Sequence, residues 1–146
     1  MMEFTNFWCF RLNAISRKVS RLWTARCSEY GITAPQSFVI LDVNNYEGSS
    51  VKDIATRIEL DSSAVTGLID RLEKENLVER QDDPDDRRGT RIFLTEKGRD
   101  LAVNKLVPEA ASFNQYIRGM IAPEIAGIFQ HTMDLFDKEI NKAVSS

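Results

Sequence analysis

The chain has 146 residues, of which 42% are hydrophobic and 28% charged, and its formal net charge is −3 at pH 7. This composition is typical of one globular domain with a substantial core, and no apolar run approaches the roughly 18 residues that a membrane-spanning helix needs. The negative net charge excludes attraction of nucleic acid by a generally basic surface, so any DNA-binding function must depend on where individual arginines lie.

Cysteine usage indicates a reducing compartment. The chain has two cysteines, and we expect neither a signal peptide nor a membrane anchor. Disulfides persist mainly in oxidising compartments, where small domains that depend on them are rich in cysteine. We therefore expect a cytoplasmic protein without a disulfide framework.

Two helices are predicted in the first third of the chain. Residues 4–28 repeat apolar side chains at helical spacing, and this first helix is expected to end near Gly31. Thr33-Ala34-Pro35-Gln36 then combines an N-cap threonine, a proline in the first turn and a glutamine at the capping-box position. A second helix is therefore predicted to run to about Asn44, with an apolar face formed by Phe38, Val39, Leu41 and Ile40.

Two short helices joined by a tight turn are predicted next. Ser50-Val51-Lys52-Asp53 is another capping box, and Asp61 is the expected N-cap of the following helix, which begins after a turn of only a few residues. That helix has apolar residues at a spacing of three, one and three, namely Val65, Leu68, Ile69 and Leu72. This pattern is typical of a helix-turn-helix.

A long β-hairpin is predicted after the helix-turn-helix. The β-like runs 77–80 and 91–94 enclose a charged tip, residues 82–91, in which aspartates and a proline are followed by three arginines. The tip has no reason to pack on its own protein and is suited to contact an anion. Residues 50–99 contain ten Lys or Arg against twelve Asp or Glu, so the arginines must act individually.

Helices are predicted again in the last third. Thr95 is the expected N-cap of a long helix to about Gly119, which Pro108 should kink or locally open, and Pro123 is expected to begin a last helix. The predicted fold is mainly α with a small β-hairpin wing, an α+β arrangement. The last helix has an apolar stripe formed by Ile125, Ile128, Phe129, Phe136 and Ile140.

The outer face of the second short helix and the hairpin tip form a predicted DNA-binding surface. A helix-turn-helix places the start of its second helix in the major groove, where small hydroxyl side chains and an arginine bond phosphates or base edges. Arg87 and Arg88 are predicted to enter a narrow minor groove, with Asp86 orienting one guanidinium as a support of the wing. The alternative is an ordinary solvated helix face and a solvated charged loop. The predicted contact residues are Ser50, Lys52, Ser62, Ser63, Thr66, Arg71, Arg87, Arg88 and Thr90.

Six segments of the chain carry a resemblance to a known family: Thr33-Ala34-Pro35-Gln36, Val51-Lys52-Asp53-Ile54-Ala55, residues 62–72, Leu77-Val78-Glu79-Arg80, residues 83–88 and Leu94-Thr95-Glu96-Lys97-Gly98. With them the chain resembles the MarR family of dimeric winged-helix transcriptional regulators. The resemblance covers nearly the whole chain, and the wing is its most specific part. It implies an obligate dimer joined by its first and last helices, which binds a pseudo-palindromic operator, most often as a repressor.

Dimerisation is also predicted from the residues themselves. Residues 4–28 and 100–144 hold more large apolar side chains than a winged helix of about 70 residues can cover, which favours packing across a two-fold axis. The alternative is a helical layer within one chain. We therefore divide the chain into a helical dimerisation region, residues 1–32 and 100–146, and a winged helix-turn-helix region, residues 33–99.

The resemblance further implies release from DNA by a small phenolic or carboxylate effector, or by oxidation of a cysteine. Candidate pocket residues are Arg17, which would meet a carboxylate, and Trp23 and Phe38, which would stack on an aromatic ring. The segment Trp8-Cys9-Phe10 resembles the first helix of the organic-hydroperoxide-sensing branch and makes Cys9 a candidate redox sensor. That branch's tyrosines are replaced here by Asn13, Trp23 and Ala34, and the aromatic neighbours favour a buried, inert Cys9 instead.

Two other classes of function compete with this interpretation. A winged-helix module that binds protein and not DNA is compatible with the near-neutral balance of residues 50–99. An enzyme is disfavoured, because the chain has a single histidine, His131, and no glycine-rich phosphate loop, paired metal ligands or nucleophile elbow. Cys9 paired with His131 is the one nucleophile arrangement to consider. We expect neither a cofactor nor a metal.

Overall fold

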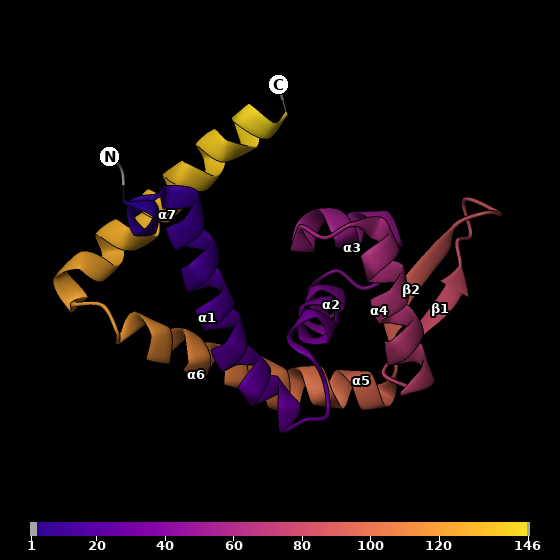
Figure 1. The fold of residues 1–146 in the computed structure, drawn as a ribbon. Helices are drawn as coiled ribbons and strands as arrows, with labels where there is room; N and C mark the ends of the chain where they lie inside the picture. Colours follow the sequence, from indigo (N-terminus) through magenta and orange to yellow (C-terminus); the bar gives the residue numbers. More distant parts are fainter. Residues whose placement is uncertain (1–2, 146) are drawn as a thin grey trace. The chain divides into compact units, whose positions relative to one another are not determined.

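The computed structural model describes residues 3–145, which fall into two compact units, one ending at Glu109 and the other beginning at Ala110. The fold is mainly helical with one two-stranded antiparallel sheet, as the sequence predicted (Figure 1). None of the described helices is long and apolar enough to cross a bilayer. The elements are η1 (Phe4–Asn6), α1 (Trp8–Ser28), α2 (Ala34–Asn45), α3 (Val51–Ile58), α4 (Ser62–Lys74), β1 (Val78–Asp82), β2 (Thr90–Leu94), α5 (Glu96–Leu101), η2 (Ala102–Leu106), α6 (Val107–Arg118) and α7 (Pro123–Val144).

The predicted helix starts are confirmed, and the capping hydrogen bonds are present at α2 and α3. At the start of α2, the Thr33 N–H donates to Gln36 Oε1 at 2.8 Å, and the Gln36 N–H donates to Thr33 Oγ1 at 3.4 Å, which completes the capping box. Ser50 caps α3 by accepting the Asp53 N–H at 3.1 Å, but the predicted capping box is only half formed, because Asp53 accepts the Ser50 hydroxyl and not its N–H. Asp61 occupies the N-cap position of α4, but its side chain makes no capping bond.

The core of the first unit lies between the helix-turn-helix and the hairpin. Val65, Leu68, Ile69 and Leu72 of α4 are all buried, as predicted. They pack with further buried residues of α2, α3 and the hairpin, namely Val39, Ile40, Val43, Ile54, Ala55, Leu77, Val78, Ile92 and Leu94.

The apolar face predicted for α2 needs a correction at Phe38. Val39 and Ile40 are fully buried, but Phe38 keeps 45% of its surface exposed and Leu41 is half-buried. The buried stripe continues at Val43, so it follows the helical positions i, i+1 and i+4 and leaves Phe38 on the outer side. A run of four apolar residues does not by itself define which side of a helix is buried.

The hairpin pairs Val78 with Leu94 at its base and Asp82 with Thr90 at its outer end. The turn after α2 adds a short third edge, because Ser49 pairs with Ile92, and the Gly48 N–H donates to the Ile92 carbonyl at 2.8 Å. Gly48 has φ +78°, a left-handed conformation that favours glycine. The hairpin base is thereby bonded to the helical layer, while residues 83–89 extend beyond α4 (Figure 1).

Pro108 is accommodated by a π-helical turn, which confirms the predicted local opening. η2 widens the helix over Ala102–Leu106, and the Val107 N–H bonds to the Ala102 carbonyl, five residues earlier. Proline has no N–H and its ring clashes with the carbonyl four residues before it. Widening the turn immediately before Pro108 removes this conflict.

The second unit contains most of α6 and all of α7. Pro123 stands at the first position of α7, as predicted. The predicted stripe of Ile125, Ile128, Phe129, Phe136 and Ile140 is present, and each of these side chains keeps 41–64% of its surface exposed in the single chain. An exposed stripe of this length indicates that another surface covers it.

A single carbonyl group joins α4, the hairpin and α5. Asn76, with φ +58°, ends α4, and the Leu77 N–H then donates to the Leu72 carbonyl at 2.9 Å in a Schellman motif. The Leu77 carbonyl accepts the Thr95 N–H at 3.2 Å. A Cβ atom at Gly98 would lie 1.8 Å from the same oxygen, so α5 approaches this closely only because residue 98 is glycine.

We predict that Gly98→Ala destabilises the protein by roughly 1–3 kcal/mol or more, because the added methyl group meets backbone atoms that are held by hydrogen bonds. Gly67→Ala is the matched control: Gly67 is also helical, and its Cβ would meet nothing within 4 Å. That change should stabilise by up to about 1 kcal/mol through helix propensity. Urea unfolding measures both, and equal midpoints for the two variants would contradict the prediction.

Candidate nucleic-acid interface

The outer face of α4 presents the predicted small polar residues. Ser62, Ser63, Thr66 and Arg71 are exposed, on the side of the helix away from the buried stripe. The Thr66 hydroxyl donates to the Ser62 carbonyl at 2.9 Å, so its donor is used within the helix. Within residues 3–145, the Ser62 and Ser63 side chains have no hydrogen-bond partner, which leaves both hydroxyls available to a ligand.

The hairpin tip is held by aspartates, although not in the predicted way. Asp83 Oδ1 accepts the Asp85 N–H at 3.0 Å and lies 3.0 Å from Arg91 Nε, and Arg91 Nη2 is 3.8 Å from an oxygen of Asp85. The Asp85 N–H and the Arg91 guanidinium both lower the pKa of the Asp83 carboxyl. Arg91, the third arginine of the tip, is therefore part of the hairpin's own structure.

Asp86 supports the tip through the backbone and not through a guanidinium. Its Oδ1 accepts the Arg88 N–H at 3.0 Å, and its carbonyl accepts the Gly89 N–H at 2.9 Å. The predicted pairing of Asp86 with the side chain of Arg87 or Arg88 was wrong for the described structure, because this turn directs the carboxylate back to the main chain. Arg87 and Arg88 are exposed and make no ion pair within the described part of the chain.

The cations of the helix-turn-helix and hairpin fall into two groups. Four arginines are bonded to carboxylates: Arg57 to Asp42, Arg80 to Asp70 and Glu73, Arg91 to Asp83, and Arg99 to Glu47. Lys97 is bonded to the Glu75 carbonyl. The other cations of residues 50–99 have neither kind of bond to the described residues: Lys52, Arg71, Lys74, Arg87 and Arg88. This unpaired set includes every predicted cationic contact residue and none of the structural arginines.

Three predicted contact residues beside this surface differ in their exposure and hydrogen bonding. Ser50 is committed to its cap, because its hydroxyl donates to Asp53 Oδ2 at 2.7 Å, and this bond lowers the pKa of Asp53. Lys52 is exposed at the start of α3. Thr90 is half-buried opposite Asp82, at the outer end of the hairpin ladder. Of the three, Lys52 is the one whose polar group needs no rearrangement to meet a phosphate.

Two arginine clusters hold the elements of the site together, and neither was predicted from the sequence. Arg57 lies in a bidentate contact with Asp42 at 2.8 and 2.7 Å and stacks over the Tyr46 ring at 4.5 Å, which joins α3 to α2. Arg80 of β1 bonds Asp70 at 2.6 Å and also bonds Glu73, which joins the hairpin to α4. The one local signal was the i, i+3 spacing of Asp70 and Glu73 on α4.

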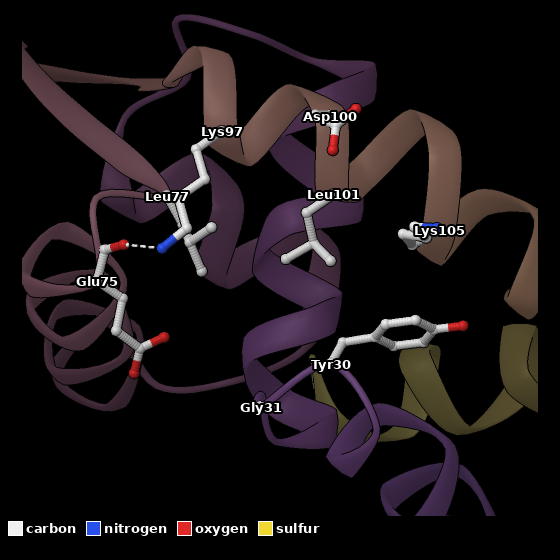
Figure 2. A pocket seen from close by; sticks show the side chains of 8 residues that line it. All are labelled: Tyr30, Gly31, Glu75, Leu77, Lys97, Asp100, Leu101 and Lys105. Carbon is white, nitrogen blue, oxygen red and sulfur yellow. Dashed lines mark hydrogen bonds between the residues drawn. The ribbon is translucent and has the colours of Figure 1, made fainter.

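The residues suggested for an effector pocket are not brought together in one hollow of the described structure. Trp23 is buried, with its Nε1–H donating to Ser37 Oγ at 2.9 Å, while Arg17 and Phe38 are exposed. A hollow of about 470 Å³ lies instead at the ends of α1 and α4. Figure 2 shows the Tyr30 ring and the side chains of Leu77 and Leu101 around it, with the Lys97 ammonium bonded to the Glu75 carbonyl. Its remaining lining residues are Gly31, Asp100 and Lys105.

The two cysteines differ in a way that the sequence did not predict. Cys9 is exposed in the single chain, with its sulfur 3.6 Å from Asn13 Nδ2, so the fold of one chain does not bury it as expected. Cys27 is the buried thiol, and burial raises its pKa against the opposing effect of a hydrogen bond with Ser37.

Comparison with known proteins shows which family the chain belongs to. The model of the MarR family matches residues 32–90, from the start of α2 to the hairpin. The chain belongs to the MarR family. Its relatives are transcriptional regulators. The chain is 40% identical over 93 residues to the HTH-type transcriptional regulator TtmR of Methylorubrum extorquens, a match that covers 64% of the chain and 48% of TtmR. It is 29% identical to SarZ of Staphylococcus epidermidis over 93% of the chain and 90% of SarZ.

A further relative and two solved structures are also similar to this chain. The organic hydroperoxide resistance transcriptional regulator of Bacillus subtilis is 32% identical over 66% of both chains. Among solved structures, the transcriptional regulator SlyA superimposes with a TM-score of 0.84 at 21% identity, over 94% of this chain and 96% of SlyA. A mutant MarR from E. coli, complexed with operator DNA, gives 0.82 at 22% identity, over 92% of this chain and 99% of that protein. The MarR fold is thus shared along nearly the whole chain.

We predict that one thiol per chain reacts quickly with a chromogenic disulfide reagent at pH 8 and that the second reacts at least about tenfold more slowly. Cys9 is exposed, whereas Cys27 is buried with a raised pKa and so carries less thiolate. Cys9→Ser should remove the fast phase and leave the slow one. Two phases of equal rate in the native protein, or a fast phase that survives Cys9→Ser, would contradict the assignment.

Proposed function

We propose that this MarR-family regulator binds a pseudo-palindromic double-stranded DNA operator as a homodimer and acts as a repressor. The observation that carries the proposal is the division of cations in the helix-turn-helix and hairpin. The arginines that organise this unit are neutralised by carboxylates, while Lys52, Arg71, Arg87 and Arg88 are exposed without a carboxylate partner in the described structure. Cations left unpaired in a chain of net charge −3 are suited to an external anion.

The side chains of α4 suit the major groove of DNA, and those of the hairpin tip suit the minor groove. Ser62, Ser63 and Thr66 at the start of α4 are small enough for close approach to base edges, and Arg71 lies further along the helix to reach phosphate or guanine. Arg87 and Arg88 project from a narrow two-stranded hairpin, a shape that fits the minor groove, where negative potential is concentrated. Two proteins of the same fold, MepR of S. aureus and the mutant MarR of E. coli, have crystal structures as complexes with DNA.

The exposed stripe of α7 supports the homodimer. Apolar side chains at Ile128, Phe129 and Phe136 are costly to leave in water, and a second copy of the same helix offers a matching surface. Two-fold symmetry would place two copies of α4 one DNA turn apart, about 34 Å. The dimerisation region, residues 1–32 and 100–146, remains our assignment of the helices that join the two copies.

We predict that Arg88→Ala weakens operator binding by about five- to tenfold and reduces the slope of log affinity against log salt by about one, because one phosphate-neutralising cation is lost. DNA fragments selected from the genome by the purified protein supply the operator, and fluorescence anisotropy over a salt series measures the affinity. Lys138→Ala is the control, since Lys138 is exposed on α7, away from the proposed DNA contacts and on the side of the helix opposite Phe136 and Ile140 of the apolar stripe.

Two outcomes of this experiment would redirect the proposal. If no DNA fragment is enriched and the protein retains a partner protein, the chain is a winged-helix protein-interaction module, which the ten-to-twelve balance of basic and acidic residues in 50–99 would accommodate. If Arg88→Ala leaves both affinity and salt slope unchanged, the wing is not a reader of DNA. Sedimentation of the same preparation as a monomer at micromolar concentration would contradict the homodimer.

We also propose that a small aromatic or carboxylate effector, or an oxidant acting on Cys9, releases the DNA. The hollow beside Leu77 is the site we assign to the effector, because its walls come from the end of α4, the start of the hairpin and α5 (Figure 2). A ligand there would contact the elements that set the direction of the wing. In BpsR of Bordetella bronchiseptica, which has this fold, DNA binding is regulated by 6-hydroxynicotinic acid.

For the effector, we predict that one or more aromatic carboxylates in a thermal-shift panel raise the melting temperature and lower operator affinity. Lys105→Ala should abolish that shift, because Lys105 is the ammonium of the hollow that has no bond to the described protein. Arg17→Ala is the comparison variant, since Arg17 lies outside the hollow. A shift that survives Lys105→Ala and is lost in Arg17→Ala would move the effector site to the residues first suggested by the sequence.

A further inference from the structure

Arg80 connects the base of the wing to the outer face of α4 through two carboxylates. Its Nη2 lies 2.6 Å from Asp70 Oδ1, and its Nη1 bonds Glu73 Oε2. Asp70 and Glu73 are three residues apart on α4, so they lie on one side of the helix. We call Arg80, Asp70 and Glu73 the wing clamp. It is the ion-pair link between β1 and α4 in the described residues.

The clamp depends on the shape of the arginine side chain. A guanidinium is planar, and its N–H groups point in fixed directions, so it can hold two separate carboxylates at once in one orientation. A lysine ammonium has the same charge but is a single point and does not fix two partners in the same geometry. The three side chains are 27%, 52% and 42% exposed, so the clamp contributes little to global stability. We therefore expect the clamp to act on the orientation of the wing relative to α4.

The wing needs such a restraint because it is long and narrow, so that a small change of angle at its base displaces its tip. A two-stranded hairpin is only marginally stable by itself, and here its outer part, residues 83–89, extends past the residues that pair with the helical layer. Arg87 lies in the turn beyond the last strand pair, Asp82 with Thr90, so it is at the far end of the hairpin from Arg80. Over a length on the order of 10–15 Å, a tilt of about 10° at the base would move the tip by roughly 2 Å, which is more than a hydrogen bond tolerates.

We infer that Arg80 is a positioning residue for DNA reading: it fixes the wing relative to α4 so that Arg71 and the tip arginines meet adjacent grooves in register, while Arg80 itself contacts no DNA. The inference rests on the proposed function. It assigns a positive role to Asp70 and Glu73, two acidic residues on the face of α4 that is proposed to approach an anion. Electrostatics alone would make both of them unfavourable for DNA binding.

The direction in which one double variant changes operator affinity separates these interpretations. The double variant Asp70→Asn, Glu73→Gln removes two negative charges beside the proposed interface. If charge alone matters, operator affinity rises; if the clamp positions the wing, affinity falls by about tenfold, the effect expected for losing one good contact. Arg80→Lys keeps the positive charge and should weaken binding to a similar extent. A residue that contacts phosphate would tolerate lysine.

Two further measurements isolate positioning from a phosphate contact and from a general loss of structure. The salt slope of Arg80→Lys should equal that of the parent, because no phosphate contact is lost, in contrast to Arg88→Ala. In the DNA-free protein, NMR order parameters of residues 83–89 should fall in Arg80→Lys. Glu47→Gln breaks the Arg99–Glu47 contact of 2.6 Å, which involves neither α4 nor the hairpin, and should change neither quantity.

The possible outcomes distinguish a failure of the proposed DNA binding from a failure of the positioning role of Arg80. If the parent protein enriches no operator, the proposed function fails, and the role of Arg80 in DNA reading fails with it. If the parent binds and the Asn/Gln double variant binds more tightly, or Arg80→Lys binds as the parent does with unchanged order parameters, only the inference about Arg80 is overturned. Weaker binding by both variants, with an unchanged salt slope and a more mobile wing, establishes it.

Discussion

The close packing around the Leu77 carbonyl is the constraint on which the candidate interface depends. This oxygen lies just after the end of α4, accepts the first N–H beyond β2 and leaves no room for a side chain at position 98. The end of one helix, the base of the hairpin and the first turn of α5 are therefore fixed at one point. Everything that the outer part of the hairpin presents to a ligand, Arg87 and Arg88 included, takes its direction from this junction and from the wing clamp a few residues away.

The pairing of charges separates the cations of this chain, whose net charge is −3, into internal supports and a few that are free to meet an external anion. Arg57, Arg80, Arg91 and Arg99 each bond a carboxylate, and this consumes much of the acidity near them. Within residues 50–99, Asp70, Glu73 and Asp83 are thus internal supports of Arg80 and Arg91, and Asp53 and Asp86 bond groups of neighbouring residues. Asp83 shows this most clearly: it holds both the Asp85 N–H and the Arg91 side chain, and its lowered pKa reflects those two contacts.

The features that could be predicted from the sequence are those whose cause is local. Thr33 with Gln36, the N-cap at Ser50 and the spacing of Val65, Leu68, Ile69 and Leu72 act within one or two helical turns, and all were confirmed. The partner of Asp86, the exposure of Phe38 and Cys9 and the requirement for Gly98 depend on what another element brings near, or on the path of a turn. Arg80 is the extreme case, since its two partners come from a different element, seven and ten residues away.

A surface built from a few placed cations has consequences for how a regulator finds its site. Non-specific affinity for DNA comes almost entirely from phosphate contacts and rises with their number. In residues 50–99, four of the seven arginines are in internal ion pairs, which lowers the non-specific affinity for DNA. Each remaining contact still contributes fully at a site where both grooves fit. Specificity then depends less on the total charge than on the angle between α4 and the hairpin. For this chain that angle is held by the Leu77 junction and by Arg80, so residues that touch no base would determine how well the bases are read.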